Sequence, residues 1–361
     1  MKKGKIWLLS VVALVAGFTS CSDDDEWNTL GDGKVKMKSS ARAFILNEGN
    51  MNKNNSKLYY FDWSEPTETV QELFEAQNEK KLGDTGNDIE VVDNNRIAVA
   101  VNVSNYVCLL DGYGIEKDRI SFEQYKNLGQ VRSIKEEDGI IYAISYGGYV
   151  SRIKINGYQL QYVDSLKVGD RPEDIAELDG KLYVTLQGTD YKDNRLAIVN
   201  SDFKTVSYTT IMQDPVKIYE EDGKLFIQGF GATFNYPWGI FDPKTGKYSE
   251  IGTASCMGTG EGILYLALSN TDWVTYETTT TLSAYNVKTA KLDEAFFKNV
   301  PEVLTSSSVY SISANPYNGN IYVATTDFIT ESIFYVFDQQ GNFLRQFSYA
   351  SPSPNKIVFL R

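Results

Sequence analysis

One short pattern of strand, turn and strand returns along nearly the whole chain, and this repetition limits the fold more than any other feature. Residues 172–206, PEDIAELDGKLYVTLQGTDYKDNRLAIVNSDFKTV, contain one full copy. Alternating apolar residues mark EDIAEL, KLYVTL and RLAIVN as strands, and Asp179-Gly180 has the composition of a two-residue hairpin turn. A turn at Asn200 then leads into a fourth strand. Each copy therefore predicts a four-stranded antiparallel sheet.

The second strand of this unit recurs at intervals of about 39 to 57 residues, the period of propeller blades. Its copies lie at Ala43 to Leu46, Arg96 to Val101, Ile140 to Ser145, Lys181 to Leu186, Lys224 to Gly229, Ile263 to Leu268 and Asn320 to Thr325. These units predict an all-β fold, a seven-bladed β-propeller over residues 41–361.

The first unit has no first strand of its own, because Ala43 to Leu46 already aligns with the second strand of the others. The last residues, Pro354 to Leu360 (PNKIVFL), match the first-strand pattern and have no second strand after them. We therefore expect the C-terminus to complete blade one, which pairs the two ends of the ring and removes exposed sheet edges.

The third strand of every unit stops at an acid or an amide, a residue type that caps tight turns by accepting backbone N–H groups. These residues are Asp62, Asp111, Asn156, Asn200, Asp242, Asn286 and Asp338. They are interpreted as turn formers and not as a catalytic set. Two insertions interrupt the pattern: residues 65–82 predict a long fourth strand with a turn, and residues 292–300 predict a short helix.

The N-terminal residues 1–20 are typical of a signal peptide, with three lysines before an apolar run, Ile6 to Phe18, too short to span a bilayer. The sequence FTSC that ends at Cys21 resembles the lipobox of bacterial lipoproteins, although Phe18 stands where Leu is commoner. The acidic run that follows resembles the surface-export signal of Bacteroidetes lipoproteins. Residues 21–40 are thus expected to hold a lipidated Cys21, this signal and a flexible tether.

Composition excludes several classes of function. A net charge of -12 with scattered Lys and Arg disfavours nucleic-acid binding. The chain has no histidine, which rules out a serine–histidine triad and imidazole metal sites. Cys108 and Cys256 lie in apolar strands and are predicted to be buried free thiols.

Unit one and the start of unit two also carry a pattern that resembles a known family. The pattern comprises Asn47-Glu48-Gly49-Asn50, then Leu73-Phe74 with Asn78, Leu82, Gly83 and Asp84, then Val101 to Asn105. It resembles Bacteroidetes surface lipoproteins with YncE-like propellers, of which the BtuG type captures cobalamin beside an outer-membrane transporter. The resemblance is specific over Phe44 to Asp111 and architectural beyond it, and the longer, more aromatic loops of blades five and six depart from the family.

In a propeller, the loops between strands two and three share one face with the blade junctions, and ligands bind on such faces. Here these loops are rich in amides, aromatic rings and glycine, which suits a large flat ligand with an amide rim or a sugar chain. The predicted ligand contacts are Asn47, Glu48, Asn50, Tyr146, Tyr191, Phe234, Tyr236, Trp238, Trp273 and Tyr276.

The family resemblance implies a lipid-anchored outer-membrane protein, exposed at the cell surface, that binds a corrinoid and passes it to a TonB-dependent transporter without catalysis. Apart from that transporter it is expected to be monomeric. Because the chain has no imidazole, a bound cobalamin should keep its own base on cobalt. Two alternatives remain open: a propeller that binds glycan, peptide or protein, and a metal-dependent lactonase or hydrolase. The latter would use Glu48, Asp84, Asp88, Asp170 and Asp174 near the channel.

Overall fold

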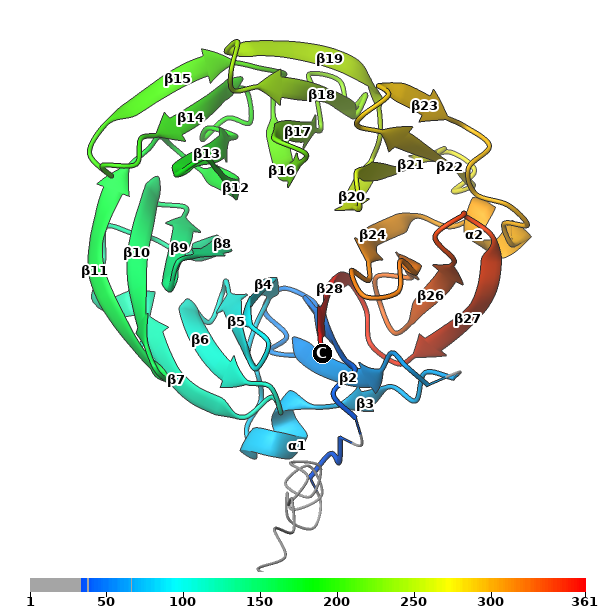
Figure 1. The fold of residues 1–361 in the computed structure, drawn as a ribbon, viewed down its shortest axis with the longest axis horizontal. Coiled ribbons are helices and arrows are strands. Elements are labelled where there is room, and N and C mark those ends of the chain that lie inside the picture. Colours follow the sequence, from blue (N-terminus) through cyan, green and yellow to red (C-terminus); the bar gives the residue numbers. More distant parts are fainter. Residues whose placement is uncertain (1–33, 38, 66) are drawn as a thin grey trace, which may run out of the picture.

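The computed structural model describes residues 34–37, 39–65 and 67–361. Over these residues the chain forms seven four-stranded antiparallel sheets arranged in a ring (Figure 1). The first strand of each sheet lies nearest the centre of the ring and the fourth lies at its rim (Figure 1). The predicted seven-bladed β-propeller is confirmed.

Blades are numbered from the N-terminus, and each is given from its inner to its outer strand. Blade 1 contains β28 (Pro354–Leu360), β1 (Arg42–Asn47), β2 (Lys57–Asp62) and β3 (Gln71–Glu72). Blade 2 contains β4 (Gly86–Asp93), β5 (Arg96–Val101), β6 (Tyr106–Asp111) and β7 (Glu116–Ser121). Blade 3 contains β8 (Val131–Glu137), β9 (Ile140–Ser145), β10 (Tyr149–Asn156) and β11 (Gln159–Lys167). Blade 4 contains β12 (Pro172–Leu178), β13 (Lys181–Leu186), β14 (Arg195–Val199) and β15 (Val206–Thr210); blade 5 contains β16 (Pro215–Glu221), β17 (Lys224–Gly229), β18 (Pro237–Asp242) and β19 (Lys247–Thr253). Blade 6 contains β20 (Cys256–Gly260), β21 (Ile263–Thr271), β22 (Thr278–Asn286) and β23 (Lys291–Asp293); blade 7 contains β24 (Val309–Ala314), β25 (Ile321–Thr326), β26 (Ser332–Phe337) and β27 (Phe343–Tyr349).

The C-terminal strand closes the ring as the sequence predicts. β28 pairs antiparallel with β1, from Arg42 opposite Leu360 to Leu46 opposite Lys356. Trp63 reinforces the join, because its indole Nε1 donates a hydrogen bond of 3.0 Å to the Leu360 carbonyl. Blade 1 is thus built from the two ends of the folded chain.

The hydrophobic core lies between adjacent blades, so both faces of a blade are covered. In β1, Phe44 packs with Ile97 and other residues of blade 2, whereas its neighbour Ile45 packs with Tyr322 and other residues of blade 7. This two-sided burial explains why the inner strands are nearly continuous apolar runs, since neither face of the sheet meets water.

The turns after the third strands largely follow the prediction. At five of the seven positions within the described residues, the side-chain oxygen accepts a backbone N–H two or three residues on; these positions are Asp62, Asp111, Asp242, Asn286 and Asp338. After Asn200 the cap is Asp202 instead, which accepts the Lys204 N–H at 3.0 Å. Asn156 precedes Gly157, whose φ of 60° makes the turn without a side-chain cap.

Both predictions for the insertions are wrong. Residues 65–82 form the short strand β3 and a helix, α1 (Phe74–Asn78), whose buried residues Phe74 and Gln77 are three positions apart, the spacing of one helix face. Blade 6 ends in the strand β23, and the helix α2 (Glu302–Thr305) begins only after Pro301, a residue suited to the start of a helix.

Cys108 and Cys256 are buried free thiols, as predicted. The predicted signal peptide and Cys21 lie outside the described residues, as does most of the tether. Within the described residues, no helix is long and apolar enough to cross a membrane.

Candidate functional site

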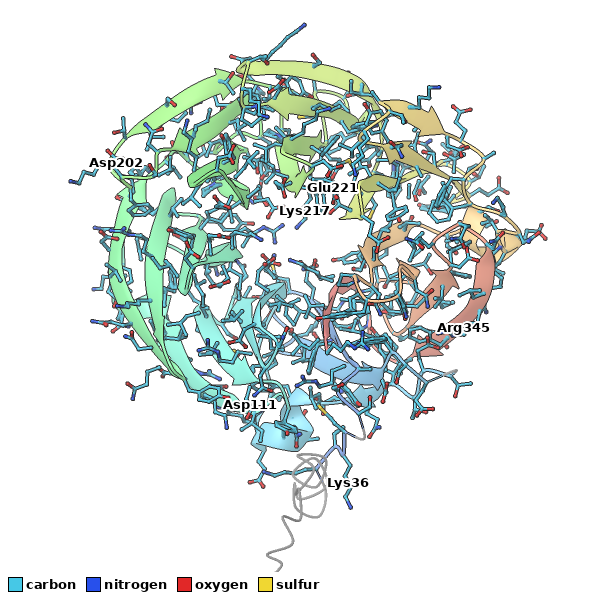
Figure 2. The ribbon with its side chains drawn as sticks, viewed as in Figure 1. Lys36, Asp111, Asp202, Lys217, Glu221 and Arg345 are labelled. Carbon is cyan, nitrogen blue, oxygen red and sulfur yellow. The ribbon has the colours of Figure 1, made fainter. Side chains whose placement is uncertain are left out.

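A cavity of about 760 Å³ occupies the centre of the ring. Residues of the seven innermost strands line it, and Lys217 is one of the side chains that project toward the centre, whereas Arg345 and Asp202 lie at the rim (Figure 2). Loop residues Tyr146, Gln187 and Tyr191 also line the cavity. All three belong to loops between second and third strands. The cavity therefore reaches the face on which the sequence predicts ligand contacts.

Charged residues from different blades meet at this mouth. Arg132 of β8 donates from Nε to Glu173 of β12 at 2.8 Å, and its Nη1 lies 3.9 Å from Glu48, the residue that follows β1. Glu48 also accepts hydrogen bonds from the Tyr310 hydroxyl and, at 3.3 Å, from Asn87 Nδ2. Burial disfavours the charged Arg132 guanidinium, but Glu173 and Glu48 outweigh it and raise the pKa of Arg132 above its ordinary value.

Arg171, at the junction of blades 3 and 4, lies between two aromatic rings. Its guanidinium carbon is 4.7 Å from the ring centroid of Tyr146 and 4.6 Å from that of Tyr191. Its Nε donates to Gln187 Oε1 at 3.0 Å and lies 3.7 Å from Glu173. Tyr146 and Tyr191 were both predicted as site residues, and the structure brings them together on this arginine.

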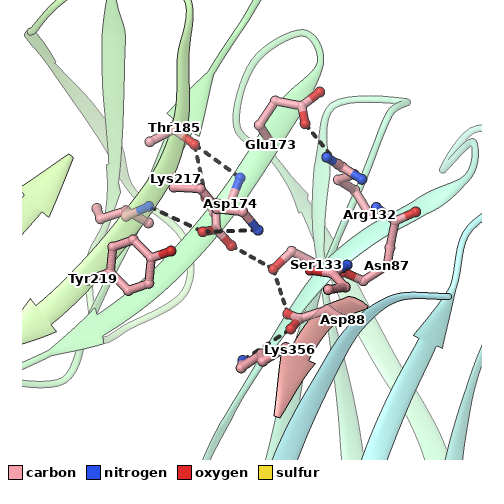
Figure 3. A network of polar contacts seen from close by, with 12 residues as sticks. Asn87, Asp88, Arg132, Ser133, Glu173, Asp174, Thr185, Lys217, Tyr219 and Lys356 are labelled. Carbon is pink, nitrogen blue, oxygen red and sulfur yellow. Dashed lines mark hydrogen bonds and ion pairs between the residues drawn. The ribbon is translucent and has the colours of Figure 1, made fainter. Parts of the chain in front are cut away.

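A second polar layer lies deeper in the channel (Figure 3). Ser133 Oγ is 2.8 Å from Asp88 Oδ2 and 2.7 Å from Asp174 Oδ1, so one hydroxyl bridges two buried carboxyl groups. Lys356 of the C-terminal strand lies 3.1 Å from Asp88, and Lys217 lies 3.9 Å from Asp174. Blades 1, 2, 3, 4 and 5 all contribute to this layer.

The bridging hydroxyl has only one proton, so it can donate to only one of the two carboxyl groups at a time. Burial disfavours the charge on Asp88, yet Lys356, Lys217 and hydrogen bonds hold its pKa below the ordinary value. Burial and repulsion from Asp88 raise the pKa of Asp174 despite Lys217. Of the two carboxyl groups, Asp174 is therefore the one whose surroundings favour the protonated form.

Asp174→Asn is expected to gain stability relative to the wild type as pH rises. The pKa of Asp174 is raised in the folded protein. Its contribution to the free energy of unfolding is therefore present at low pH and is lost as pH rises through that pKa. An asparagine Nδ2 would donate to Ser133 at every pH. The measurement is the free energy of unfolding in urea at several values between about pH 4 and about pH 8. Asp88→Asn is the control and should show the opposite trend; parallel pH curves for Asp174→Asn and wild type would contradict the assignment.

Two predicted contact residues are buried in the scaffold, which corrects the sequence interpretation. Asn47 is fully buried, where its Nδ2 donates to the Pro352 carbonyl at 2.9 Å and its Oδ1 accepts from the Tyr349 hydroxyl. Trp238 is only 2% exposed and packs edge-on against Tyr285 of blade 6. Alternation along the strands turns both side chains inward, so neither is available at the loop face.

Four further predicted residues lie on the loop face in two groups. Tyr236 and Phe234 pack around Phe230, a cavity-lining residue, at centroid distances of 6.2 and 6.1 Å. Trp273 and Tyr276 are highly exposed at the tip of the long β21–β22 hairpin and do not line the cavity.

Asn50 has a structural role at this face. Its Nδ2 donates to the Phe328 carbonyl at 2.9 Å, which ties the blade 1 loop to the blade 7 loop. A ligand contact by Asn50 would compete with that bond.

Arg132, Arg171, Glu173 and Tyr310 are the mouth residues that the sequence-based list omits. All four lie on first strands or on a blade junction, where the inward direction of a side chain follows from β alternation. Arg171 and Glu173 belong to the charged junction GDRPED, and this charge could have drawn attention to them in the sequence. Their approach to Glu48 could not be predicted, because Glu48 is far from them in the chain.

Of the five carboxylates that a metal site was expected to use, Asp88 and Asp174 come together across Ser133, and the others have separate partners. Both Asp84 oxygens accept backbone N–H groups, of Asn52 and Asn54, while Asp170 pairs with Lys167 at 3.0 Å. Within the described residues, no three acidic or cysteine side chains are grouped so as to hold a metal ion.

Comparison with known proteins bears on the fold. No family model and no curated protein matches the sequence. A structure from Bacteroides fragilis, described as a candidate 6-phosphogluconolactonase, has a TM-score of 0.61 at 14% identity over 91% of this chain and 100% of its own. This chain is a β-propeller. A Bacteroides uniformis propeller of the same description has a TM-score of 0.61 at 11% identity, over 89% of this chain and 100% of its own, and a Lactobacillus plantarum protein has 0.57 at 12%, over 89% and 99%.

Proposed function

We propose that this propeller binds a corrinoid of the cobalamin class over its channel mouth. In this proposal it is a cell-surface lipoprotein anchored through Cys21 that passes the ligand to an outer-membrane transporter. The family resemblance of residues 44–111 motivates the choice of ligand, and the chemistry of the loop face supports it.

The observation that carries the proposal is the distribution of exposed apolar side chains. Half of the large hydrophobic residues that are exposed within the described part of the chain lie on the loops between second and third strands: Met51, Tyr191, Phe234, Trp273, Val274, Tyr276, Phe328 and Ile329. Apolar residues gathered on one face mark a binding site. The cavity beside them lies within the volume range of small-molecule sites.

Backbone strain in these loops points the same way. Tyr191, Phe234, Tyr236, Tyr276 and Phe328 all have φ between 52° and 62°, a conformation that bulky residues rarely adopt. Each such residue costs on the order of 1 kcal/mol, and strain of this kind clusters at functional sites. The strained backbone holds these aromatic rings in fixed orientations on the loop face. Rings that are already fixed lose little entropy when a ligand binds, and this gain in affinity would offset the cost of the strain.

The direct test is calorimetric titration of the purified protein with cyanocobalamin. Stoichiometric heat with tight binding supports the proposal, and the absorption spectrum should show the cofactor's own base still on cobalt. Absence of heat at about micromolar concentration would reject it, since such a site would have to bind at least that tightly to capture a vitamin.

Tyr191→Ala should weaken cyanocobalamin binding about tenfold, because an aromatic residue buried by a ligand is worth roughly 1.5 kcal/mol or more. Tyr208→Ala is a matched control: both tyrosines are 47% exposed and each stacks on an arginine, but Tyr208 lies on the outer strand of the same blade. Calorimetry of both variants measures the difference. Equal effects of the two substitutions would place the ligand elsewhere.

A lactone hydrolase is the second candidate, because two similar propellers are described as candidate 6-phosphogluconolactonases. Glu48 and Arg132 at the mouth would be its polar groups. Acid release from 6-phosphogluconolactone, followed in a pH-stat with and without a chelator, tests it. Turnover above the uncatalysed rate that is lost in Glu48→Gln would favour hydrolysis over binding alone.

A further inference from the structure

Arg171 is held in one orientation at the channel mouth with its donor edge unused. Tyr146 and Tyr191 cover the two faces of the guanidinium, and Gln187 takes the Nε hydrogen. Within the described residues, no hydrogen bond uses its two terminal nitrogens. The side chain is 32% exposed and lines the cavity. A stacked guanidinium therefore presents a row of N–H donors to whatever enters the mouth.

The backbone at Arg171 is strained as well. Its φ is 52°, in the left-handed region that non-glycine residues seldom occupy, and the next residue is Pro172. The Arg171 side chain is partly exposed and contacts Tyr146, Tyr191 and Gln187 of the loops, so an apolar core environment does not account for the strained backbone here. Strain at a partly exposed arginine is an observation from which a functional role can be inferred.

The charges around Arg171 limit the ligand group that fits. Arg132 and Arg171 share Glu173, Glu48 lies 3.9 Å from Arg132, and the buried Asp214 also interacts electrostatically with Arg171, so acidic groups already surround the two arginines. A doubly charged group would meet repulsion from Glu173. A group with one negative charge spread over two oxygens matches the guanidinium fork and adds the least repulsion.

We propose that Arg171 binds an acid group with two parallel oxygens, a phosphodiester or a carboxylate, on the ligand held at the mouth. The guanidinium edge would donate two N–H bonds to that group while the two tyrosines keep its plane fixed. This inference deepens the proposed function and rests on it only in the choice of a corrinoid as one probe. A lysine cannot replace this arrangement, because it has neither the planar fork nor the stacking surface.

The first experiment compares cyanocobalamin, which contains a phosphodiester, with dicyanocobinamide, which lacks it. Arg171→Lys should weaken cyanocobalamin about tenfold or more, the loss expected for charge-assisted hydrogen bonds, and should change cobinamide binding less than about twofold. Arg152→Lys is the control, because Arg152 also stacks on an aromatic ring, Phe203, and pairs with an acid, Asp164, but does not line the cavity. An equal loss for both corrinoids, or no loss for either, would overturn the assignment.

A second experiment separates failure of this inference from failure of the proposed function. If neither corrinoid binds the wild type, the corrinoid proposal fails, and the arginine is tested with dimethyl phosphate and acetate instead. The readout is the NMR resonance of the Arg171 Nε–H, assigned by its absence in Arg171→Lys. A shift with one of these anions, but not with chloride at equal ionic strength, supports the site. The anion that causes the shift shows whether Arg171 prefers a phosphodiester or a carboxylate. A resonance that moves with neither overturns it.

Discussion

Removal of residues 353–361 is expected to leave a chain that no longer unfolds cooperatively near the wild-type midpoint. These residues contain β28, in which Ile357, Val358, Phe359 and Leu360 are all buried. Burial of a large apolar side chain contributes about 1.5–3 kcal/mol, so the four together contribute about 6–12 kcal/mol. The net stability of a domain is about 5–15 kcal/mol. Loss of this strand therefore removes most of the net free energy that keeps the domain folded.

Two variants make that result interpretable. Removal of Arg361 alone should be silent, because the residue is exposed and follows the strand. Addition of a peptide with the sequence of residues 353–361 should restore part of the lost stability to the shortened chain. Thermal unfolding followed by circular dichroism measures all three samples. An unchanged midpoint after the full truncation would mean that β28 does not hold the ring closed.

Lys356→Met is expected to lower the free energy of unfolding by about 2 kcal/mol at neutral pH, a value below that for a fully buried pair because the lysine keeps some contact with water. Lys356 lies 3.1 Å from Asp88 and 2.5 Å from Glu90, and its side chain is 36% exposed in the channel. Its removal leaves the buried Asp88 carboxylate without its nearest cation. Urea unfolding of wild type and variant measures the effect.

The pH dependence of this substitution has a definite sign. In the folded protein the pKa of Asp88 lies below its ordinary value. The stability that the Lys356–Asp88 pair contributes is therefore complete at pH values above the ordinary pKa and is lost as pH falls below it. The destabilisation by Lys356→Met should therefore shrink in acid. Lys217→Met is the control, because Lys217 is equally exposed but its ion-pair contact, with Asp174, is 3.9 Å long. Equal losses in the two variants would argue against a special role for Lys356.

Much of the fold could be predicted because it depends on local patterns. Alternating apolar residues and Asp-Gly turns identify strands one hairpin at a time, and seven repeats of such a unit close into a ring. The insertion after β2 was predicted wrongly because α1 has only five residues, too few for the helical spacing of Phe74 and Gln77 to stand out in the sequence. The helix near residue 300 was misplaced for a similar reason, since short helices depend on tertiary contacts.

The candidate site was only half predictable. Loop composition selected Glu48, Tyr146, Tyr191 and Phe234, which the structure places at or near the channel mouth. It also selected Asn47 and Trp238, which strand alternation turns into the interior. The loop to which a residue belongs can be read from the sequence, but the direction of its side chain at the loop boundary cannot.

The sequence by itself determined the blade architecture and the C-terminal closure, because both follow from a repeat of a few tens of residues and from the strand that its first copy lacks. Only the tertiary structure decided which charges meet. The stacking of Arg171 between Tyr146 and Tyr191, and the contacts of Ser133 with Asp88 and Asp174, join residues from different blades. Their contacts depend on the curvature of the closed ring, and no local pattern encodes the distance between two blades.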